Sequence, residues 1–175
     1  MNKSKIKVSV IVPTMGFSDS VNEILNQLKL QTHKPSEVIL VDSSRDNSVK
    51  KVSEKYNSFF NIKVIDVNNA FPGEARNLGV HESSYSVLAF LDSKTIPNED
   101  WLEYGLNKLD VHEDSIIFGS TLYKAKTNKQ KILQACIFGS SPVTTTPGSV
   151  LKKKTFLDIG YFVEGVRTGD DLEWR

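Results

Sequence analysis

Three short runs of apolar, largely β-branched residues constrain the fold of this chain more than any other feature. They are Ile6–Val12, closed by Pro13, then Val38–Val41, and Val87–Leu91. Each run is too short for a typical helix and lacks the strict polar alternation of a strand with one wet face. Such runs are typical of strands buried on both faces of a parallel sheet.

Helical periodicity appears between these runs. Val21, Ile24, Leu25 and Leu28 recur at helical spacing. Further helices are expected over Gly73–His81, from about Pro97–Asn98, and over Lys129–Phe138. Two more strands are expected at Ile62–Val67 and Ile116–Ser120, whereas the Ser-, Thr- and Pro-rich segment Ser140–Ser149 reads as a loop. The alternation predicts an α/β fold, a three-layer αβα sandwich with a mostly parallel central sheet.

The composition narrows the class of protein. The 175 residues carry 22 basic and 21 acidic side chains, a net charge of 22 − 21 = +1, which argues against a nucleic-acid partner. Cys136 is the single cysteine, so neither an internal disulfide nor a multi-cysteine zinc site is expected. No apolar run reaches the roughly 18 residues of a membrane span, and no signal peptide is evident. We therefore expect a cytoplasmic protein with one domain, 1–175. Because Gly169–Arg175 reads as a loop entering a helix, that domain is expected to be truncated at its C-terminal end.

Polar residues follow three of the predicted strands, as Pro13-Thr14, Asp42-Ser43-Ser44 and Asp92-Ser93-Lys94. In open α/β sheets, ligands bind outside the carboxyl ends of the strands. Each group alone is an ordinary helix cap or turn former, but three together favour a ligand site. No glycine-rich phosphate loop follows the first strand, so the common dinucleotide-binding and P-loop classes are disfavoured.

Five blocks, in order, resemble the inverting nucleotide-sugar glycosyltransferases of family 2, which have the GT-A fold. The blocks are Val8-Ser-Val-Ile-Val-Pro-Thr14, Val41-Asp-Ser-Ser-Arg-Asp-Asn-Ser48, Pro72-Gly-Glu-Ala-Arg-Asn-Leu-Gly79, Phe90-Leu-Asp-Ser-Lys-Thr-Ile-Pro97 followed by Trp101-Leu102, and Gly169-Asp-Asp-Leu-Glu-Trp-Arg175. Each block alone is weak, but their order and spacing make the set specific.

The resemblance implies a nucleotide site. Pro13, Thr14 and Asp42 would border the nucleobase, most often uracil, with the Asp42 carboxylate accepting a base N–H. Arg76 would approach the nucleotide, because a guanidinium suits a base carbonyl or diphosphate oxygens. The competing interpretations are that Asp42 caps the following turn and that Arg76 forms a surface ion pair with Glu74 or another acid.

Asp92-Ser93-Lys94 stands where the family has the Asp-X-Asp motif that holds a divalent cation. An ammonium cannot ligate a cation, so Lys94 puts metal binding by Asp92 in doubt. Three explanations stay open. Asp92 alone holds Mn²⁺ or Mg²⁺; Lys94 supplies the positive charge in a metal-independent mechanism; or Lys94 points to solvent and catalysis is impaired.

Asp170 and Asp171 resemble the family's acidic pair, whose second member is the general base. By that match, Asp171 would take the proton from the acceptor hydroxyl. The alternative is an ordinary helix start, since Gly169-Asp170-Asp171 also has the character of an N-cap followed by first-turn acids.

The expected function is therefore inverting transfer of a sugar from a nucleotide-diphosphate donor, UDP-linked by resemblance, to a hydroxyl of a glycan, a lipid-linked or a protein acceptor. The alternatives are a catalytically degenerate nucleotide-sugar binding module and a nucleotidyltransferase, although the latter lacks its glycine-rich loop. Peripheral association with the inner membrane face is compatible with the sequence, since Lys152-Lys153-Lys154 could touch anionic lipid, but a solvated face is the simpler reading. Cys136, among apolar neighbours, is expected to be buried.

Overall fold

The structure is a computed structural model that describes residues 6–170 apart from 17, 45 and 113. Its centre is a six-stranded sheet with the order β3-β2-β1-β4-β6-β5. The strands are β1 Val8–Thr14, β2 Glu37–Asp42, β3 Asn61–Asp66, β4 Val87–Phe90, β5 Ile117–Thr121 and β6 Val143–Lys152. Strands β1 to β4 are parallel, and β6 pairs antiparallel with both β4 and β5. The predicted α/β class with a mostly parallel sheet is confirmed.

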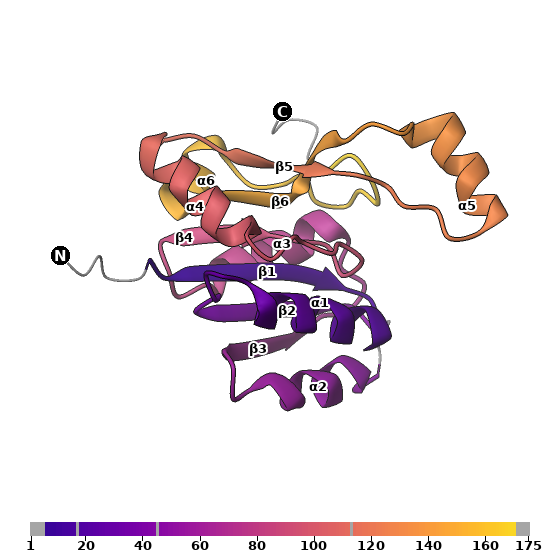
Figure 1. Ribbon diagram of the computed structural model, residues 1–175. Helices are drawn as coiled ribbons and strands as arrows, with labels where there is room; N and C mark the ends of the chain where they lie inside the picture. The colour runs from indigo at the N-terminus through magenta and orange to yellow at the C-terminus, as the bar shows by residue number, and fades with distance from the viewer. Residues whose placement is uncertain (1–5, 17, 45, 113, 171–175) are drawn as a thin grey trace.

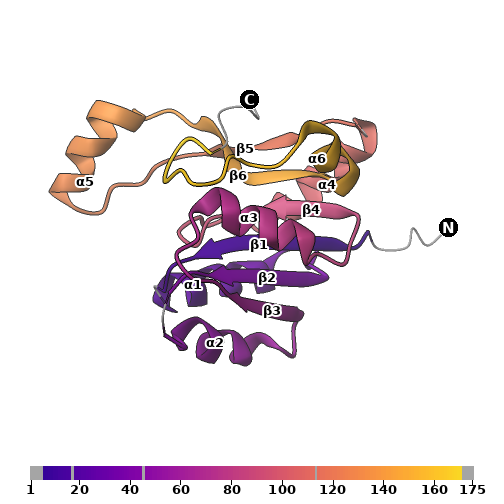
Figure 2. The same cartoon turned by 180° about the vertical axis from the view of Figure 1, so that it is seen from behind.

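The helices are α1 Ser18–Leu30, α2 Ser48–Ser53, α3 Pro72–His81, α4 Trp101–Val111, α5 Asn128–Leu133 and α6 Lys153–Ile159. A 3₁₀ turn, Glu54–Tyr56, follows α2, and a π-helical turn, Gln134–Phe138, follows α5. Helices α1, α2 and α4 cover one face of the sheet, and α3 and α6 cover the other (Figures 1 and 2). The strands thus lie between two helical layers, as the alternation of strands and helices predicts.

The pleat of the strands divides the core into two clusters. Along β1, Val8, Val10 and Val12 face α1, whereas Ile11 packs on the opposite side beneath α3. Burial on both sides explains why these strands read as nearly continuous apolar runs. At the crossing of α3 over β1 the packing is so close that a Cβ on Gly79 would lie 2.4 Å from Cγ2 of Ile11.

Two predictions are wrong in the C-terminal third. The segment 140–149, read as a loop, supplies most of β6, whose Thr146 and Ser149 are buried between β4 and β5. Its Thr, Ser, Pro and Gly residues are typical of loops, but residues 143–145 pair with β5, and the strand continues into residues 150–152, which pair with β4. Cys136, expected to be buried, is exposed in the π-helical turn that follows α5, a helix with no buried residue.

The lysine run is only partly a solvated face. Lys153 donates from Nζ to the backbone and hydroxyl oxygens of Ser83, which anchors the start of α6 to the loop before β4. The helix near Pro97–Asn98 begins at Trp101, since the preceding residues form a turn in which the Trp101 amide donates to Asn98. None of the helices in the described part of the chain is long and apolar enough to cross a bilayer.

Candidate functional site

The polar strand ends gather at one edge of the sheet. Strand β1 lies between β2 and β4, so Thr14, Asp42 and the residues after Phe90 come from neighbouring strands. Pro13 and Thr14 lie opposite Val41 and Asp42 in the parallel register. The predicted convergence of these strand ends is therefore found, at the edge where open α/β sheets bind ligands.

Asp42 is fully buried and organises the loops around it. Its Oδ1 accepts hydrogen bonds from Oγ1 of Thr14 at 2.8 Å and from the amides of Gly16 and Ser44 at 3.1 and 3.2 Å. Its Oδ2 accepts from the Ser44 hydroxyl at 2.6 Å. Asp42 thus caps the turn after β2, as one interpretation of the sequence held. A carboxylate oxygen has two lone pairs, so Oδ2 retains capacity for a further donor such as a base N–H.

Arg76 joins two distant carboxylates. It lies on α3 with only 4% of its surface exposed, donates from Nη1 to Asp170 at 2.5 Å, and donates from Nη2 to Asp92 at 2.7 Å. Its Cζ also lies 5.4 Å from the centroid of the Phe162 ring. Asp92 follows β4 and Asp170 belongs to the C-terminal segment, so one guanidinium connects three separate parts of the chain.

The competing interpretation, a surface ion pair of Arg76 with Glu74 or another acid, holds only in part: Arg76 pairs with two other acids, Asp92 and Asp170, and it is buried. Glu74 accepts from the amides of Phe71 and Gly165, which caps the start of α3 and holds the C-terminal segment. Residues two apart on a helix do not face each other, so the spacing of Glu74 and Arg76 already disfavours this pair. Arg76 Nε is buried and has no hydrogen-bond partner among residues 6–170 as described.

Asn77, for which no role was predicted, fixes the segment 162–170 against α3. Its Nδ2 donates to the Phe162 carbonyl and to the Glu164 carboxylate, and its Oδ1 accepts from the Phe162 amide, all at 3.0 Å. Asparagine is a poor helix former in a helix interior, which is the one signal in the sequence for a special role. Gly73 allows the close approach, because a Cβ there would meet the Val163 carbonyl oxygen at 2.5 Å.

The turn after β4 presents one carboxylate. The Asp92 side chain keeps 46% of its surface exposed while Oδ1 engages Arg76, and the Thr95 amide donates to the Asp92 carbonyl. Lys94 lies exposed on the same turn. Nowhere in the described ranges do three or more potential metal ligands cluster. Mg²⁺ and Mn²⁺ can be bound by a single protein carboxylate when substrate phosphates and water supply the other ligands. Asp92 fits that role.

The structure describes only one of the two acids of the C-terminal motif, Asp170. Asp170 is 6% exposed and its carboxylate pairs with Arg76. The predicted base, Asp171, lies outside the described residues. Because the Asp170 carboxylate is paired with Arg76, Asp170 suits the role of a residue that positions the C-terminal segment.

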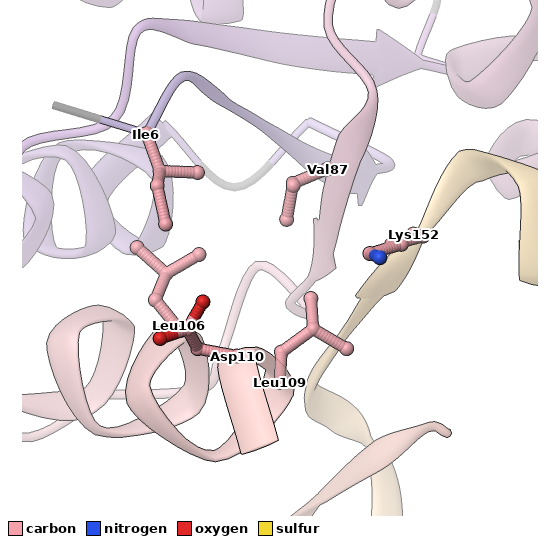
Figure 3. A pocket seen from close by; sticks show the side chains of 6 residues that line it. All are labelled: Ile6, Val87, Leu106, Leu109, Asp110 and Lys152. Atoms are coloured by element: carbon pink, nitrogen blue, oxygen red, sulfur yellow. The ribbon is translucent and has the colours of Figure 1, made fainter. Parts of the chain in front are cut away.

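A small pocket lies elsewhere, at the opposite edge of the sheet (Figure 3). Apolar side chains of α4, of the start of β4 and of the segment before β1 line it, with Asp110 and Lys152 at its margin; the apolar ones are Ile6, Val87, Leu106 and Leu109. It contains none of the strand-end residues, so it is not part of the candidate site.

Comparison with known proteins gives a consistent match. The model of the family described as glycosyl transferase family 2 matches residues 9–167. Glycosyltransferase AglE of Haloferax volcanii is 26% identical over 183 residues, which cover 95% of this chain and 59% of that protein. The poly(ribitol-phosphate) beta-N-acetylglucosaminyltransferase TarS of Staphylococcus aureus is 26% identical over 182 residues, 95% of this chain and 31% of that protein. The chain thus spans three fifths or less of these relatives' length.

Solved structures agree with the fold. The structure of S. aureus TarS 1–349 in complex with UDP-GlcNAc has a TM-score of 0.69 at 26% identity, and the match covers 95% of this chain and 51% of that one. The mannosyltransferase PcManGT from Pyrobaculum calidifontis, in complex with GDP-Man and Mn²⁺, has a TM-score of 0.69 at 19% identity, covering 98% and 51%. At that identity the second likeness shows the fold alone. With a family model matching most of its length and these relatives agreeing, the chain belongs to glycosyl transferase family 2.

Proposed function

We propose that the chain binds a UDP-sugar at the carboxyl edge of its sheet and transfers the sugar with inversion to an acceptor hydroxyl. The observation that carries this proposal is the buried Arg76, which connects the Asp92 turn with the Asp170 segment. In this proposal Asp92 serves the donor diphosphate, and Asp170 belongs to the segment that leads to the base for the acceptor. The complex of the related TarS with UDP-GlcNAc supports a UDP-linked donor.

Each residue has a role in this proposal. Pro13, Thr14 and Asp42 border the base, and Asp42 Oδ2 accepts its N–H. Arg76, by exchanging the Asp92 carboxylate for phosphate, offers donors to the diphosphate.

Transfer itself needs a proton acceptor on the side away from the leaving group. Asp171 takes the proton of the acceptor hydroxyl as that oxygen bonds to the anomeric carbon. The bond from the anomeric carbon to the diphosphate oxygen breaks, and its electron pair leaves with UDP. Asp170, paired with Arg76, is the positioning residue of the segment that precedes this base.

The charge of the departing diphosphate is offset in one of two ways. Mn²⁺ or Mg²⁺ held by Asp92 supplies Lewis-acid stabilisation when it is bound. Alternatively Lys94 supplies the positive charge as a phosphate-binding ammonium. The exposed Lys94 beside a lone carboxylate is the observation that keeps the second route, and also the degenerate binding module, as candidates.

Titration calorimetry of UDP, GDP and CDP, each in Mn²⁺ and in EDTA, tests the binding step. We expect UDP to bind best, and we expect Asp42→Asn to weaken UDP more than CDP, because an amide can no longer act as a pure acceptor. Absence of any nucleotide binding by a folded protein would overturn the proposal.

Release of UDP from UDP-GlcNAc, measured with and without EDTA in wild type and Lys94→Ala, tests which group offsets the charge of the departing diphosphate. Lys50→Ala, an exposed lysine on α2, is the matched control. Activity that survives EDTA but not Lys94→Ala assigns the charge to Lys94. Activity lost in EDTA and kept in Lys94→Ala assigns the charge to a metal, and loss of Mn²⁺-dependent activity in Asp92→Asn would place that metal at Asp92. Tight UDP binding without turnover identifies a binding module.

The acceptor class also belongs to this proposal. A glycan, a lipid-linked or a protein hydroxyl suits the chemistry equally, and no nucleic acid is expected. Association with the inner face of a membrane is proposed on a separate observation.

A further inference from the structure

The connection between β5 and β6 is an arm that projects from the body (Figures 1 and 2). We define the arm as residues 122–142. It contains α5 and the π-helical turn, and it leaves and rejoins the sheet between Thr121 and Val143, which are register partners. No residue of α5 is buried. The arm is therefore a long insertion into an antiparallel hairpin and adds no side chain of α5 to the core.

The arm projects from the same edge of the sheet as the candidate site. Strand β6 is antiparallel to both β4 and β5, so β5 runs in the same direction as β4. The carboxyl end of β5 therefore lies at the edge where Thr14, Asp42 and Asp92 lie, and Figure 1 shows α5 beyond the arrowhead of β1. A surface that contacts the arm would face the site.

The arm combines exposed apolar side chains with positive charge. Ile132 is 64% exposed and Leu133 is 51% exposed, and Leu122 and Tyr123 near the base of the arm are also exposed. Between Asp114 and Asp158 the sequence has no acidic residue. The arm itself carries four exposed lysines, Lys124, Lys126, Lys129 and Lys131.

This chemistry selects among partners. A second copy of the arm would bring lysines against lysines, which is repulsive. A soluble polyanion would account for the lysines but leaves the exposed aliphatic side chains unexplained. An anionic bilayer accounts for both, because lysines are attracted to lipid phosphates while apolar side chains enter the boundary between headgroups and acyl chains.

We propose that the arm docks the protein onto an anionic phospholipid surface. Ile132 and Leu133 enter the interface, and the four lysines extend their charged ends to the headgroups. Docking in this way turns the carboxyl edge of the sheet toward the bilayer. The proposal does not rest on the transferase function, since vesicle binding is measured without donor or acceptor.

Co-sedimentation of the 175-residue chain with lipid vesicles tests whether the arm docks onto an anionic phospholipid surface. One set contains phosphatidylcholine alone, and the other has part of that lipid replaced by phosphatidylglycerol. We expect binding to the anionic vesicles only, weakening as salt is raised. An attraction of about 1 kcal/mol per lysine corresponds to about fivefold in affinity, so Lys126→Gln, Lys129→Gln and Lys131→Gln together should weaken binding by more than tenfold.

A matched control removes the same charge elsewhere. Lys50, Lys51 and Lys55 lie exposed on and just after α2, and their triple change to Gln should leave binding within about twofold of wild type. Ile132→Ser with Leu133→Ser should also abolish binding while thermal unfolding is unchanged, because neither side chain is buried.

Several results would overturn the proposal. They are absence of binding to anionic vesicles, equal loss in the α2 control, or full binding by the serine variant. If the serine variant binds both vesicles and inorganic polyphosphate as tightly as wild type, the arm is a polyanion site and the lipid proposal is wrong.

Discussion

At the scale of single residues, Arg76 shows how strongly the candidate site depends on long-range partners. A guanidinium with 4% exposure is tolerable only because Asp92 and Asp170 meet it. Asp170 is nearly as buried, whereas Asp92 is half exposed. The buried Arg76–Asp170 pair and the half-exposed Arg76–Asp92 pair should therefore contribute differently to the free energy of unfolding.

Arg76→Met should destabilise the fold by about 3–5 kcal/mol, because it leaves the Asp170 carboxylate buried without a partner. Asp92→Asn should cost less than about 1 kcal/mol, since water already reaches that carboxylate. Urea unfolding of the two variants beside wild type measures the difference. Equal effects of the two changes would contradict the asymmetry.

The two adjacent acids should separate in function. Asp171→Asn should leave UDP binding and stability near wild type and reduce turnover by about a hundredfold or more, as removal of a general base does. Asp170→Asn should lower stability, because it exchanges a carboxylate for an amide facing Arg76. Calorimetry, unfolding and UDP release measured on the same preparations decide the assignment. An active Asp171→Asn protein would remove it from the role of base.

The contacts of the candidate residues depend on partners far away along the chain, which no local motif predicts. Asp42 and Arg76 were located by motif, but the partners of Arg76 come from 16 and 94 residues away along the chain. Asn77 was missed as an anchor because its partners, Phe162 and Glu164, lie in a segment with no regular pattern.

At the scale of elements, β2 carries a buried carboxylate at each end. Asp42 closes its carboxyl end, and Glu37 lies fully buried at its start. Glu37 accepts from the Ser9 hydroxyl at 2.6 Å, from the Ser84 amide at 2.6 Å and from the Ser84 hydroxyl at 3.0 Å, and it lies 3.4 Å from Lys63 Nζ. These contacts tie β1, β3 and the loop before β4 to the edge opposite the site.

Glu37, at the start of β2, should make the stability of the fold sensitive to acid. Burial raises the pKa of Glu37, but the hydrogen bonds from Ser9 and Ser84 and the charge of Lys63 outweigh it, so the pKa lies below its ordinary value of 4.5. A lowered folded-state pKa gives stability that is present above the unfolded pKa and is lost as pH falls through the folded pKa. Glu37→Gln should therefore cost about 1–3 kcal/mol at neutral pH and progressively less below pH of about 4.

Urea unfolding of both proteins as a function of pH checks this. Ser36→Ala, a change at the neighbouring position that leaves the carboxylate in place, is the control for position. A difference between Glu37→Gln and wild type that is constant across the acid range would show that ionisation of Glu37 is not its source.

Elements with one strong periodicity were predictable, and elements defined by pairing were not. The parallel strands and α1 follow from local apolar spacing. Strand β6 was misread because its burial depends on lying between β4 and β5, a property of topology. Helix α6 was hidden by its leading lysines, of which Lys153 turns inward to Ser83.

At the scale of the whole molecule, the sheet and the arm are separable. Alternating strands and helices predict the parallel sheet. No local pattern shows that the last strand, β6, inserts between β4 and β5 and runs antiparallel to both. That insertion creates the β5–β6 hairpin and leaves residues 122–142 outside the sheet. The hairpin pairing at Thr121 and Val143 continues without any contribution from α5.

Replacing residues 122–142 with a two-residue Asn-Gly turn should therefore leave the fold intact. Such a turn joins antiparallel strands at the register that Thr121 and Val143 already have. We expect the free energy of unfolding to stay within about 1 kcal/mol of wild type, because the arm buries little and its loop closure opposes folding only weakly. The same protein should lose binding to anionic vesicles and keep binding of UDP.

Unfolding, vesicle co-sedimentation and calorimetry on the shortened protein separate the possible roles of the arm. A folded protein that still sediments with anionic vesicles would place the lipid contact elsewhere, with Lys152 and Lys154 as the next basic side chains to test. A folded protein that loses UDP binding would instead make the arm part of the donor site. Retained UDP binding with lost vesicle binding is the outcome we expect, because the strand-end residues and Arg76 all lie in the body that remains.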